Sequence, residues 1–173
     1  MPEFPSAAPD PRWVPLSDWE FDHAAHLATD RRLWSRRHGL VERASMNGDR
    51  WLKDVRGAQA ELAVAKLLDL YHCPDPTWER GKPDLVCGHE VRWGAKHDYH
   101  LPVHVYDVDD RRVFLVTGGD NQRFLVHGWM LVRDAKTIDP TWFHAMGKDT
   151  TEEFWVPQKA LRPMAALLPV EAW

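Results

Sequence analysis

The spacing of the apolar residues changes near Thr77, and this change restricts the folds that the chain can adopt. Before it, residues 17–38 and 56–71 carry apolar side chains at the spacing of amphipathic helices. Ser17 is a suitable N-cap for the first of these helices, and Gly39 is suited to end it. The second segment, RGAQAELAVAKLLDLY, is rich in strong helix formers. The first part of the chain is therefore predicted to be helical.

After Thr77 the pattern favours β-strands. The segments rich in β-branched and aromatic residues are 84–86, 90–95, 103–108, 112–117 and 124–132. The turn sequences between them are Cys87-Gly88-His89, Asp109-Asp110 and Gly118-Gly119. A last segment, 156–168, is predicted to be a short helix that begins at Pro157 and bends near Pro163. Strands in succession after two helices predict an α+β sandwich, with a central mixed, mainly antiparallel sheet flanked by helices.

The length of 173 residues fits one domain with a real hydrophobic core. We place this domain at residues 17–173, because the five prolines within residues 1–16 favour a flexible N-terminal arm. A hydrophobic fraction of 44% with ten tryptophans is typical of a packed protein. Such a chain is expected to fold alone or as a small oligomer such as a homodimer.

Charge and cysteine content exclude several other classes. The net charge of −4 gives no general basic field, so any binding of nucleic acid has to be local. Cys73 and Cys87 form no CxxC pair, which argues against a zinc ribbon or a disulfide framework. No apolar run reaches the roughly 18 residues of a membrane span, and the start of the chain lacks the order of a signal peptide. We therefore expect a protein of the cytoplasm, with no membrane partner.

The segment GKPDLVCGHEVR carries the clearest chemical pattern in the chain. On an extended strand Glu90 and Arg92 project to one face, and Val91 projects to the other. Asp84 precedes the turn at Gly88, which can return its carboxylate to the neighbourhood of Glu90. Two carboxylates beside a cationic side chain suit the binding of a hard cation such as Mg²⁺ and the hydrolysis of a phosphodiester.

Three motifs in this order resemble those of the PD-(D/E)XK nuclease superfamily. They are Gly57-Ala58-Gln59-Ala60-Glu61 opening a helix, Pro83-Asp84 entering a strand, and Glu90-Val91-Arg92. The later strands and the closing segment are similar to those of small phage or prophage nucleases, so the resemblance covers roughly residues 20–168. It implies a restriction-endonuclease-like fold and a Mg²⁺ or Mn²⁺ cofactor.

The resemblance also implies roles for individual residues. Asp84 and Glu90 would be catalytic metal ligands, the Val91 carbonyl would be a backbone ligand, and Glu61 would be the helix acid of the metal site. The alternatives remain that Glu61 is an ordinary acid in the first turns of a helix and that the two other acids are solvated charges of a hairpin.

Arg92 departs from the family pattern, which has lysine at this position. A guanidinium stays protonated and presents a planar fork, so Arg92 can stabilise phosphate charge but is a poor proton carrier. Lys96 lies on the same face of an ideal strand but roughly 13 Å from Arg92. A bend at Gly94 would be needed to bring Lys96 into the catalytic group.

Contacts with a nucleic acid are predicted at two places. The only dense basic run on this acidic chain is formed by Arg31, Arg32, Arg36 and Arg37. These residues can contact a DNA backbone, or they can form a solvated face of the helix. Trp93, beside the predicted acidic site, can contact a base or sugar, or it can belong to the core.

The resemblance favours a metal-dependent deoxyribonuclease, an enzyme of a bacterial or phage-infected cell. The alternative is a catalytically inactive protein of the nuclease fold that acts as a nucleic-acid-binding or protein-binding module, and Arg92 is the reason to retain it. An RNA-directed nuclease would differ only in its substrate and cannot be separated from the first hypothesis by sequence.

Overall fold

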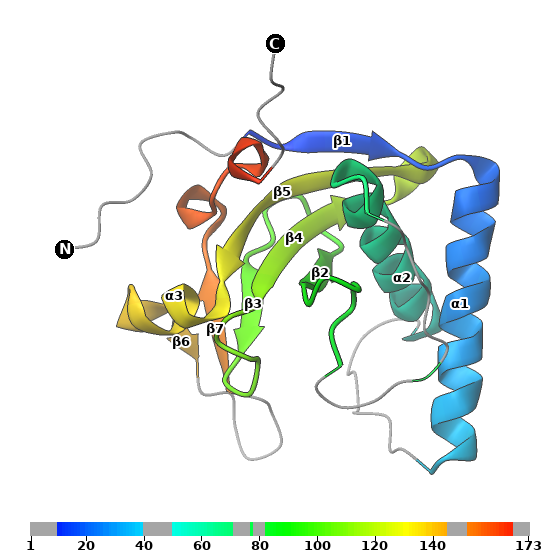
Figure 1. Ribbon diagram of the computed structural model, residues 1–173, viewed down its shortest axis with the longest axis horizontal. Coiled ribbons are helices and arrows are strands. Elements are labelled where there is room, and N and C mark those ends of the chain that lie inside the picture. Colours follow the sequence, from blue (N-terminus) through cyan, green and yellow to red (C-terminus); the bar gives the residue numbers. More distant parts are fainter. Residues whose placement is uncertain (1–9, 40–49, 71–76, 78–81, 145–151, 168–173) are drawn as a thin grey trace.

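The computed structural model describes residues 10–39, 50–70, 77, 82–144 and 152–167 (Figure 1). Helix α1 (Asp18–Arg37) follows the predicted N-cap, because the Ser17 side chain accepts a hydrogen bond from the Glu20 backbone and the Glu20 carboxylate accepts one from the Ser17 backbone. Gly39 adopts a φ of +65° just after the helix. The predicted first helix is confirmed at both ends.

Helix α2 (Arg50–Leu67) begins six residues before the predicted start of the second helix. The prediction that Glu61 lies in the first turns of the helix is therefore wrong, because Glu61 lies in the interior of α2. The small residues Ala60, Ala63 and Val64 are buried and allow the helix backbone to approach its neighbours closely. Helix α2 packs against the main sheet, and α1 packs against α2 (Figure 1). Neither helix is long and apolar enough to cross a membrane, and the same holds for the other helices in the described part of the chain.

The main sheet has the strand order β1-β5-β4-β2. Its strands are β1 (Arg12–Pro15), β2 (Glu90–Gly94), β4 (Arg112–Gly118) and β5 (Arg123–Leu131). β2 runs parallel to β4, and the other neighbours are antiparallel. The predicted mixed, mainly antiparallel sheet of an α+β fold is thus confirmed.

Strand β1 lies in the segment that was predicted to be a flexible arm. It pairs with β5 from Arg12 opposite Val126 to Pro15 opposite Arg123, and Val14 and Leu16 are buried. The prediction is therefore wrong for residues 12–16. Pro15 is tolerated because β1 is an edge strand, where a missing backbone donor breaks no interior ladder. Residues 1–9 of the predicted arm lie outside the described residues.

A second, antiparallel sheet has the order β3-β7-β6. Its strands are β3 (Leu101–His104), β6 (Phe143–His144) and β7 (Glu153–Val156). The strand predicted at 103–108 thus begins and ends earlier and does not join the main sheet. Helix α3 (Val132–Thr137) follows β5, and one-turn 3₁₀ helices lie at Asp120–Gln122 and Pro140–Trp142.

The predicted closing helix at 156–168 is wrong. The chain instead has two 3₁₀ turns, Gln158–Ala160 and Met164–Ala166, after β7. Each turn follows a proline with extended backbone, Pro157 or Pro163, and a second proline so close to the first prevents a continuous α-helix. Residue 168 lies outside the described residues.

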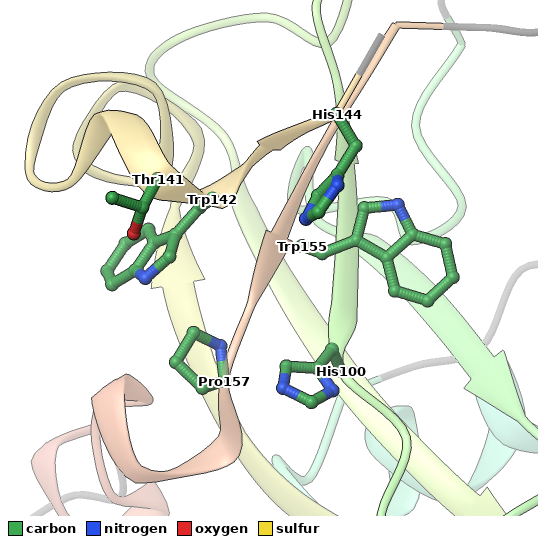
Figure 2. Close-up of a pocket in the computed structure, with 6 residues that line it drawn as sticks. All are labelled: His100, Thr141, Trp142, His144, Trp155 and Pro157. Atoms are coloured by element: carbon green, nitrogen blue, oxygen red, sulfur yellow. The ribbon is translucent and has the colours of Figure 1, made fainter. Parts of the chain in front are cut away.

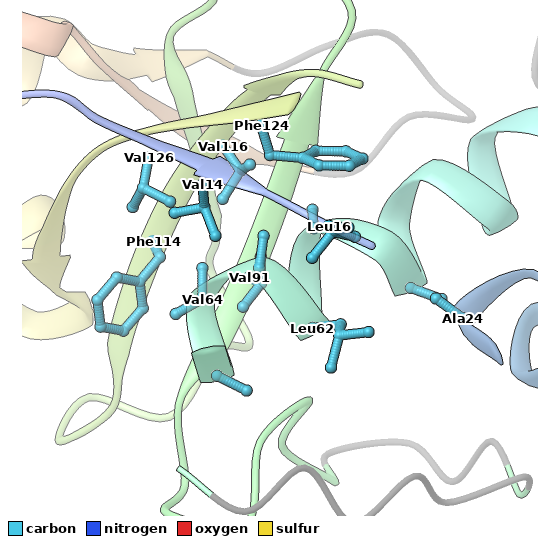
Figure 3. Packing of buried hydrophobic residues seen from close by; sticks show 14 of the residues in the cluster. Val14, Leu16, Ala24, Leu62, Val64, Val91, Phe114, Val116, Phe124 and Val126 are labelled. Atoms are coloured by element: carbon cyan, nitrogen blue, oxygen red, sulfur yellow. The ribbon is translucent and has the colours of Figure 1, made fainter. Parts of the chain in front are cut away.

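The alternation of side chains along β4 builds a hydrophobic core on each face of the main sheet. Phe114 and Val116 face the core beneath α2, where they pack with residues such as Val64 (Figure 3). Val113 and Leu115 point to the opposite face and belong to the core beneath the second sheet. All four side chains are fully buried, so β4 is the central layer of the molecule.

Gly128 in β5 lies beside the irregularity where the pairing of β4 and β5 shifts register. Its φ is +151°, and a Cβ at this position would lie 2.5 Å from the Arg162 carbonyl oxygen.

Gly128→Ala should therefore lower the free energy of unfolding by about 1–3 kcal/mol, as overpacking against a backbone atom does. Gly57→Ala is the matched control, because Gly57 lies inside α2 with open space around its Cβ position. The control should raise stability by about 0.5–1 kcal/mol. Urea unfolding measures both, and equal effects would contradict the close approach at Gly128.

Candidate functional site

Asp84 lies in a turn and not in the predicted strand 84–86. The Leu85 backbone N–H donates to the His89 carbonyl at 3.1 Å, and the Gly88 N–H donates to the Leu85 carbonyl at 2.9 Å. Gly88 adopts a φ of +83°, which favours glycine. This turn folds the chain back, so that Asp84 Oδ2 accepts a hydrogen bond of 2.8 Å from the Val91 backbone N–H. Asp84 thereby satisfies a backbone donor of β2.

Arg92 joins three carboxylates. Its Nη1 atom lies 3.6 Å from Asp84 Oδ2 and 3.3 Å from Glu90 Oε2. Its Nη2 atom donates to both carboxylate oxygens of Asp107, at 3.1 and 3.0 Å. The structure therefore brings Asp84 and Glu90 to the same guanidinium nitrogen.

Glu61 reaches the same region from α2. Both of its carboxylate oxygens accept from Arg31 Nη1 at 2.8 Å, which holds Glu61 to α1. The charge of Glu61 acts on the pKa of Asp84, and the charge of Glu90 acts on the pKa of Glu61. We call Glu61, Asp84, Glu90 and Asp107 the acidic cluster.

The acidic cluster concentrates negative charge in a poorly solvated place. Burial raises the pKa of Asp84 to about 8, with further contributions from the carboxylates of Glu61 and Glu90, while Arg92 opposes the shift. Burial likewise raises the pKa of Glu61 against the opposing effect of Arg31. The Asp84 side chain keeps 27% of its surface exposed, so water screens part of the penalty. A proton or a cation is favoured at this point.

Two members of the site were not selected from the sequence. Asp107 lies in the turn after β3 with only 6% of its side chain exposed, and Arg111, just before β4, donates from Nη1 to Glu90 Oε1. Asp107 was hidden inside the strand predicted at 103–108, and the available signal was a carboxylate within a segment otherwise typical of a strand. No local pattern distinguishes Arg111 from its neighbour Arg112.

Three of the four predicted metal ligands converge on one atom, whereas the fourth, Glu61, is paired with Arg31. Arg92 Nη1 lies within hydrogen-bonding or ion-pair distance of Asp84 Oδ2, Glu90 Oε2 and the Val91 carbonyl oxygen, the last at 3.4 Å. Two carboxylates and a carbonyl are the oxygen donors that Mg²⁺ and Mn²⁺ accept, so the donor set fits such an ion in kind. The cationic position among them is held by the guanidinium, and among the described residues no group of three or more His, Cys, Asp or Glu is arranged to hold a metal.

Lys96 and Trp93 do not join the acidic cluster. β2 pairs regularly with β4 as far as Gly94 opposite Thr117, and Lys96 is exposed in the turn beyond that end. The bend that would bring Lys96 to Arg92 is therefore absent. Trp93 packs against the core beneath α2, and its Nε1 donates to the Gly118 carbonyl at 2.9 Å, which fits the alternative that Trp93 belongs to the core.

The predicted basic run divides into two pairs. Arg31 binds Glu61, and Arg32 forms an ion pair of 2.8 Å with Asp54. Arg36 and Arg37 are exposed in the last turn of α1. Arg31 thus belongs to the acidic cluster as a counter-ion, and only the second pair retains the form of a solvent-facing basic surface.

A pocket on the second sheet offers a different chemistry (Figure 2). The residues that line it are His100, Thr141, Trp142, His144, Trp155 and Pro157. Its lining consists of two histidines, two tryptophans, a threonine and a proline, and it includes no carboxylate and so no member of the acidic cluster. The acidic cluster is therefore the better candidate for metal or phosphate chemistry.

Comparison with known proteins assigns no family to this chain. No protein-family model matches it, and neither a curated protein nor a solved structure shows significant similarity to it. Functional inference therefore has to start from the acidic cluster itself.

The raised pKa of Asp84 predicts a pH-dependent stability in the absence of metal. The folded protein binds this proton more tightly than the unfolded chain does, because the pKa rises from 3.8 to about 8 on folding. The stabilisation by the proton is complete below the unfolded pKa and is lost as the pH rises between about 4 and about 8. Asp84→Asn, which keeps an acceptor for the Val91 N–H, removes this dependence.

Urea unfolding in EDTA at about pH 5 and about pH 8.5 measures the effect. The stability of Asp84→Asn relative to the wild type should increase by about 1–3 kcal/mol from the lower to the higher pH. Asp110→Asn is the control, because 86% of the Asp110 side chain is exposed. A stability difference between Asp84→Asn and wild type that does not change with pH would show that Asp84 is ionised without penalty.

Proposed function

We propose that the protein is a metal-dependent nuclease that hydrolyses phosphodiester bonds of DNA. The observation that carries this proposal is the position of Arg92 Nη1, a cationic atom at the convergence of Asp84, Glu90 and the Val91 carbonyl. Oxygen atoms gathered around a cation, in a place where burial penalises their negative charge, favour the entry of Mg²⁺ or Mn²⁺. The order of the motifs along the chain, which resembles that of PD-(D/E)XK nucleases, supports the same proposal.

Each residue of the site then has a definite role. Asp84 and Glu90 bind the ion together with the Val91 carbonyl, and Glu61 supports it from α2. A bound divalent ion supplies polarisation of the phosphodiester and activation of a water molecule. Arg92 stabilises the negative charge that develops on the phosphate, since a guanidinium remains protonated next to carboxylates. Such an enzyme acts on DNA in the cytoplasm of a bacterial or phage-infected cell.

A second candidate function is a nuclease-fold protein that binds nucleic acid or protein without turnover. The observation that favours it is that Arg92 already satisfies the carboxylates which a metal would need. If the guanidinium cannot be displaced, the acidic cluster is a structural ion-pair network. The two candidates differ in whether a divalent ion can compete with Arg92 Nη1.

A cleavage assay distinguishes the two candidates. Linear, nicked, branched and single-stranded DNA, with single-stranded RNA in parallel, should be incubated with Mg²⁺, Mn²⁺ or EDTA. We expect metal-dependent cutting of DNA by the wild type. Asp84→Ala should lower the rate of cutting by at least about 10²-fold. Asp110→Ala, which changes an exposed acid of the same region, is the control and should cut like the wild type. Absence of cutting by a wild-type protein that still binds Mn²⁺ would favour the binding module, and cutting of RNA alone would change the substrate.

The exposed end of α1 provides a test of DNA binding. Arg36 and Arg37 are exposed, and neither belongs to the acidic cluster. Each phosphate contact releases counterions, so Arg36→Ala combined with Arg37→Ala should weaken DNA binding and reduce the slope of log affinity against log salt by about one to two. Fluorescence anisotropy over a range of salt concentrations measures this, with Arg133→Ala, another exposed arginine, as the control. An unchanged slope would show that this end of α1 is only a solvated surface.

A further inference from the structure

Asp107 makes the closest contacts to Arg92. The two hydrogen bonds from Nη2 to the Asp107 oxygens measure 3.1 and 3.0 Å, whereas the contacts of Nη1 with Asp84, Glu90 and the Val91 carbonyl measure 3.3 to 3.6 Å. Charge-assisted hydrogen bonds weaken steeply with distance, so the Asp107 side of the guanidinium is the more firmly held.

The position of Asp107 is fixed independently of the other acids. Its Oδ2 accepts from the His104 backbone N–H at 2.9 Å, and its own N–H donates to the His104 carbonyl at 3.0 Å. Lys136 of α3 donates to the Asp107 carbonyl at 2.7 Å. These contacts anchor Asp107 to the end of β3 and to α3, and not to the elements that carry Asp84 and Glu90. Asp107 can therefore keep its place when the charge around those two carboxylates changes.

We propose that Asp107 is a positioning residue, which holds Arg92 at the site by Nη2 while Nη1 yields its place among Asp84, Glu90 and Val91 to a divalent cation. This inference rests on the proposed function. A cation and a guanidinium compete for the same two carboxylates, and a cation also repels the guanidinium. Asp107 reduces the competition and offsets the repulsion, so Arg92 remains beside the metal to meet the phosphate. Without this anchor Arg92 is held only by the longer contacts of Nη1, so its guanidinium becomes mobile and also competes with the metal for Asp84 and Glu90.

Hydrogen exchange at the Arg92 Nε–H reports this anchoring, and its measurement needs neither a bound metal nor enzymatic activity. Arg92 Nε is buried and has no hydrogen-bond partner among the described residues, so its proton is shielded from water only as long as the guanidinium stays in place. In ¹⁵N-labelled, metal-free protein, with Arg92→Lys identifying the resonance, the Nε–H of Arg92 should be protected from exchange in the wild type and in Asp110→Asn. Asp107→Asn should accelerate that exchange by about tenfold or more.

Asp107→Asn suits this purpose because it removes the charge and keeps an acceptor for the His104 N–H. Asp107→Glu restores the charge one methylene further out and should recover part of the protection, which a purely structural role in the turn would not produce. Undiminished protection of the Arg92 Nε–H in Asp107→Asn would overturn the proposal.

A double-mutant cycle for Mn²⁺ affinity, measured by calorimetry, tests the link to the metal. In the wild-type background Asp107→Asn should weaken binding by about tenfold, because Arg92 then competes fully for the metal ligands. In the Arg92→Ala background the same change should cost less than about threefold, the direct effect of one lost charge. Equal losses in both backgrounds would refute positioning through Arg92. A wild type that binds no Mn²⁺ would refute the proposed nuclease function and the yielding of Nη1 to a cation, whereas faster Nε–H exchange in Asp107→Asn would still support the anchoring of Arg92 by Asp107.

Discussion

Carboxylates cannot be buried side by side unless cations or protons lie among them, and this constraint organises the molecule around its acidic cluster. The arginines that supply the countercharge are Arg31, Arg92 and Arg111. Each of them joins two parts of the fold. Arg31 joins α1 to α2, Arg92 joins β2 to the turn after β3, and Arg111 joins the start of β4 to β2. The ion pairs of the site therefore also connect the two helices with each other and the main sheet with the second sheet.

The same constraint determines how a metal would bind in the proposed chemistry. A site whose acids are neutralised by an internal guanidinium folds without metal, but the metal then has to compete with Arg92. A lysine at this position would be a compact point charge with freely rotating donors, whereas a guanidinium has two nitrogen groups that can serve different partners. Arg92 uses this property, because Nη1 faces Asp84 and Glu90 while Nη2 faces Asp107. Where the motif that this segment resembles has lysine, this protein thus has an arginine together with a carboxylate that fits it.

The two-sided burial of β4 explains how a small chain holds such a site firmly. Helix α2 covers one face of the main sheet and brings Glu61, while the second sheet covers the other face and fixes the turn that carries Asp107. β2, the strand with Glu90 and Arg92, lies at the edge of the main sheet beside β4. At an edge, the backbone of β2 is free to be capped by Asp84, and side chains from both layers can reach its end.

Much of the local structure was determined by the sequence alone. The N-cap and end of α1, the positions of β4 and β5, and the common face of Glu90 and Arg92 follow from hydrogen bonds and periodicities that act over a few residues. The start of α2 was missed because the sequence of residues 50–55 was not distinguished from the polar stretch before it. β1 was missed because its strand character comes from pairing with a segment more than a hundred residues away.

Only the tertiary structure decided which charges meet. The pairs Arg31 with Glu61 and Arg92 with Asp107 join residues 30 and 15 positions apart. The pair of Arg92 with Asp107 depends on the place of β3, which belongs to the second sheet, where it pairs with β7, and not to the main sheet. Electrostatic partners are chosen by distance and burial in space, and neither has a signature in local sequence. For that reason the sequence predicted a group of acids with one arginine, whereas the fold decided that this arginine would be held by a carboxylate of the opposite layer.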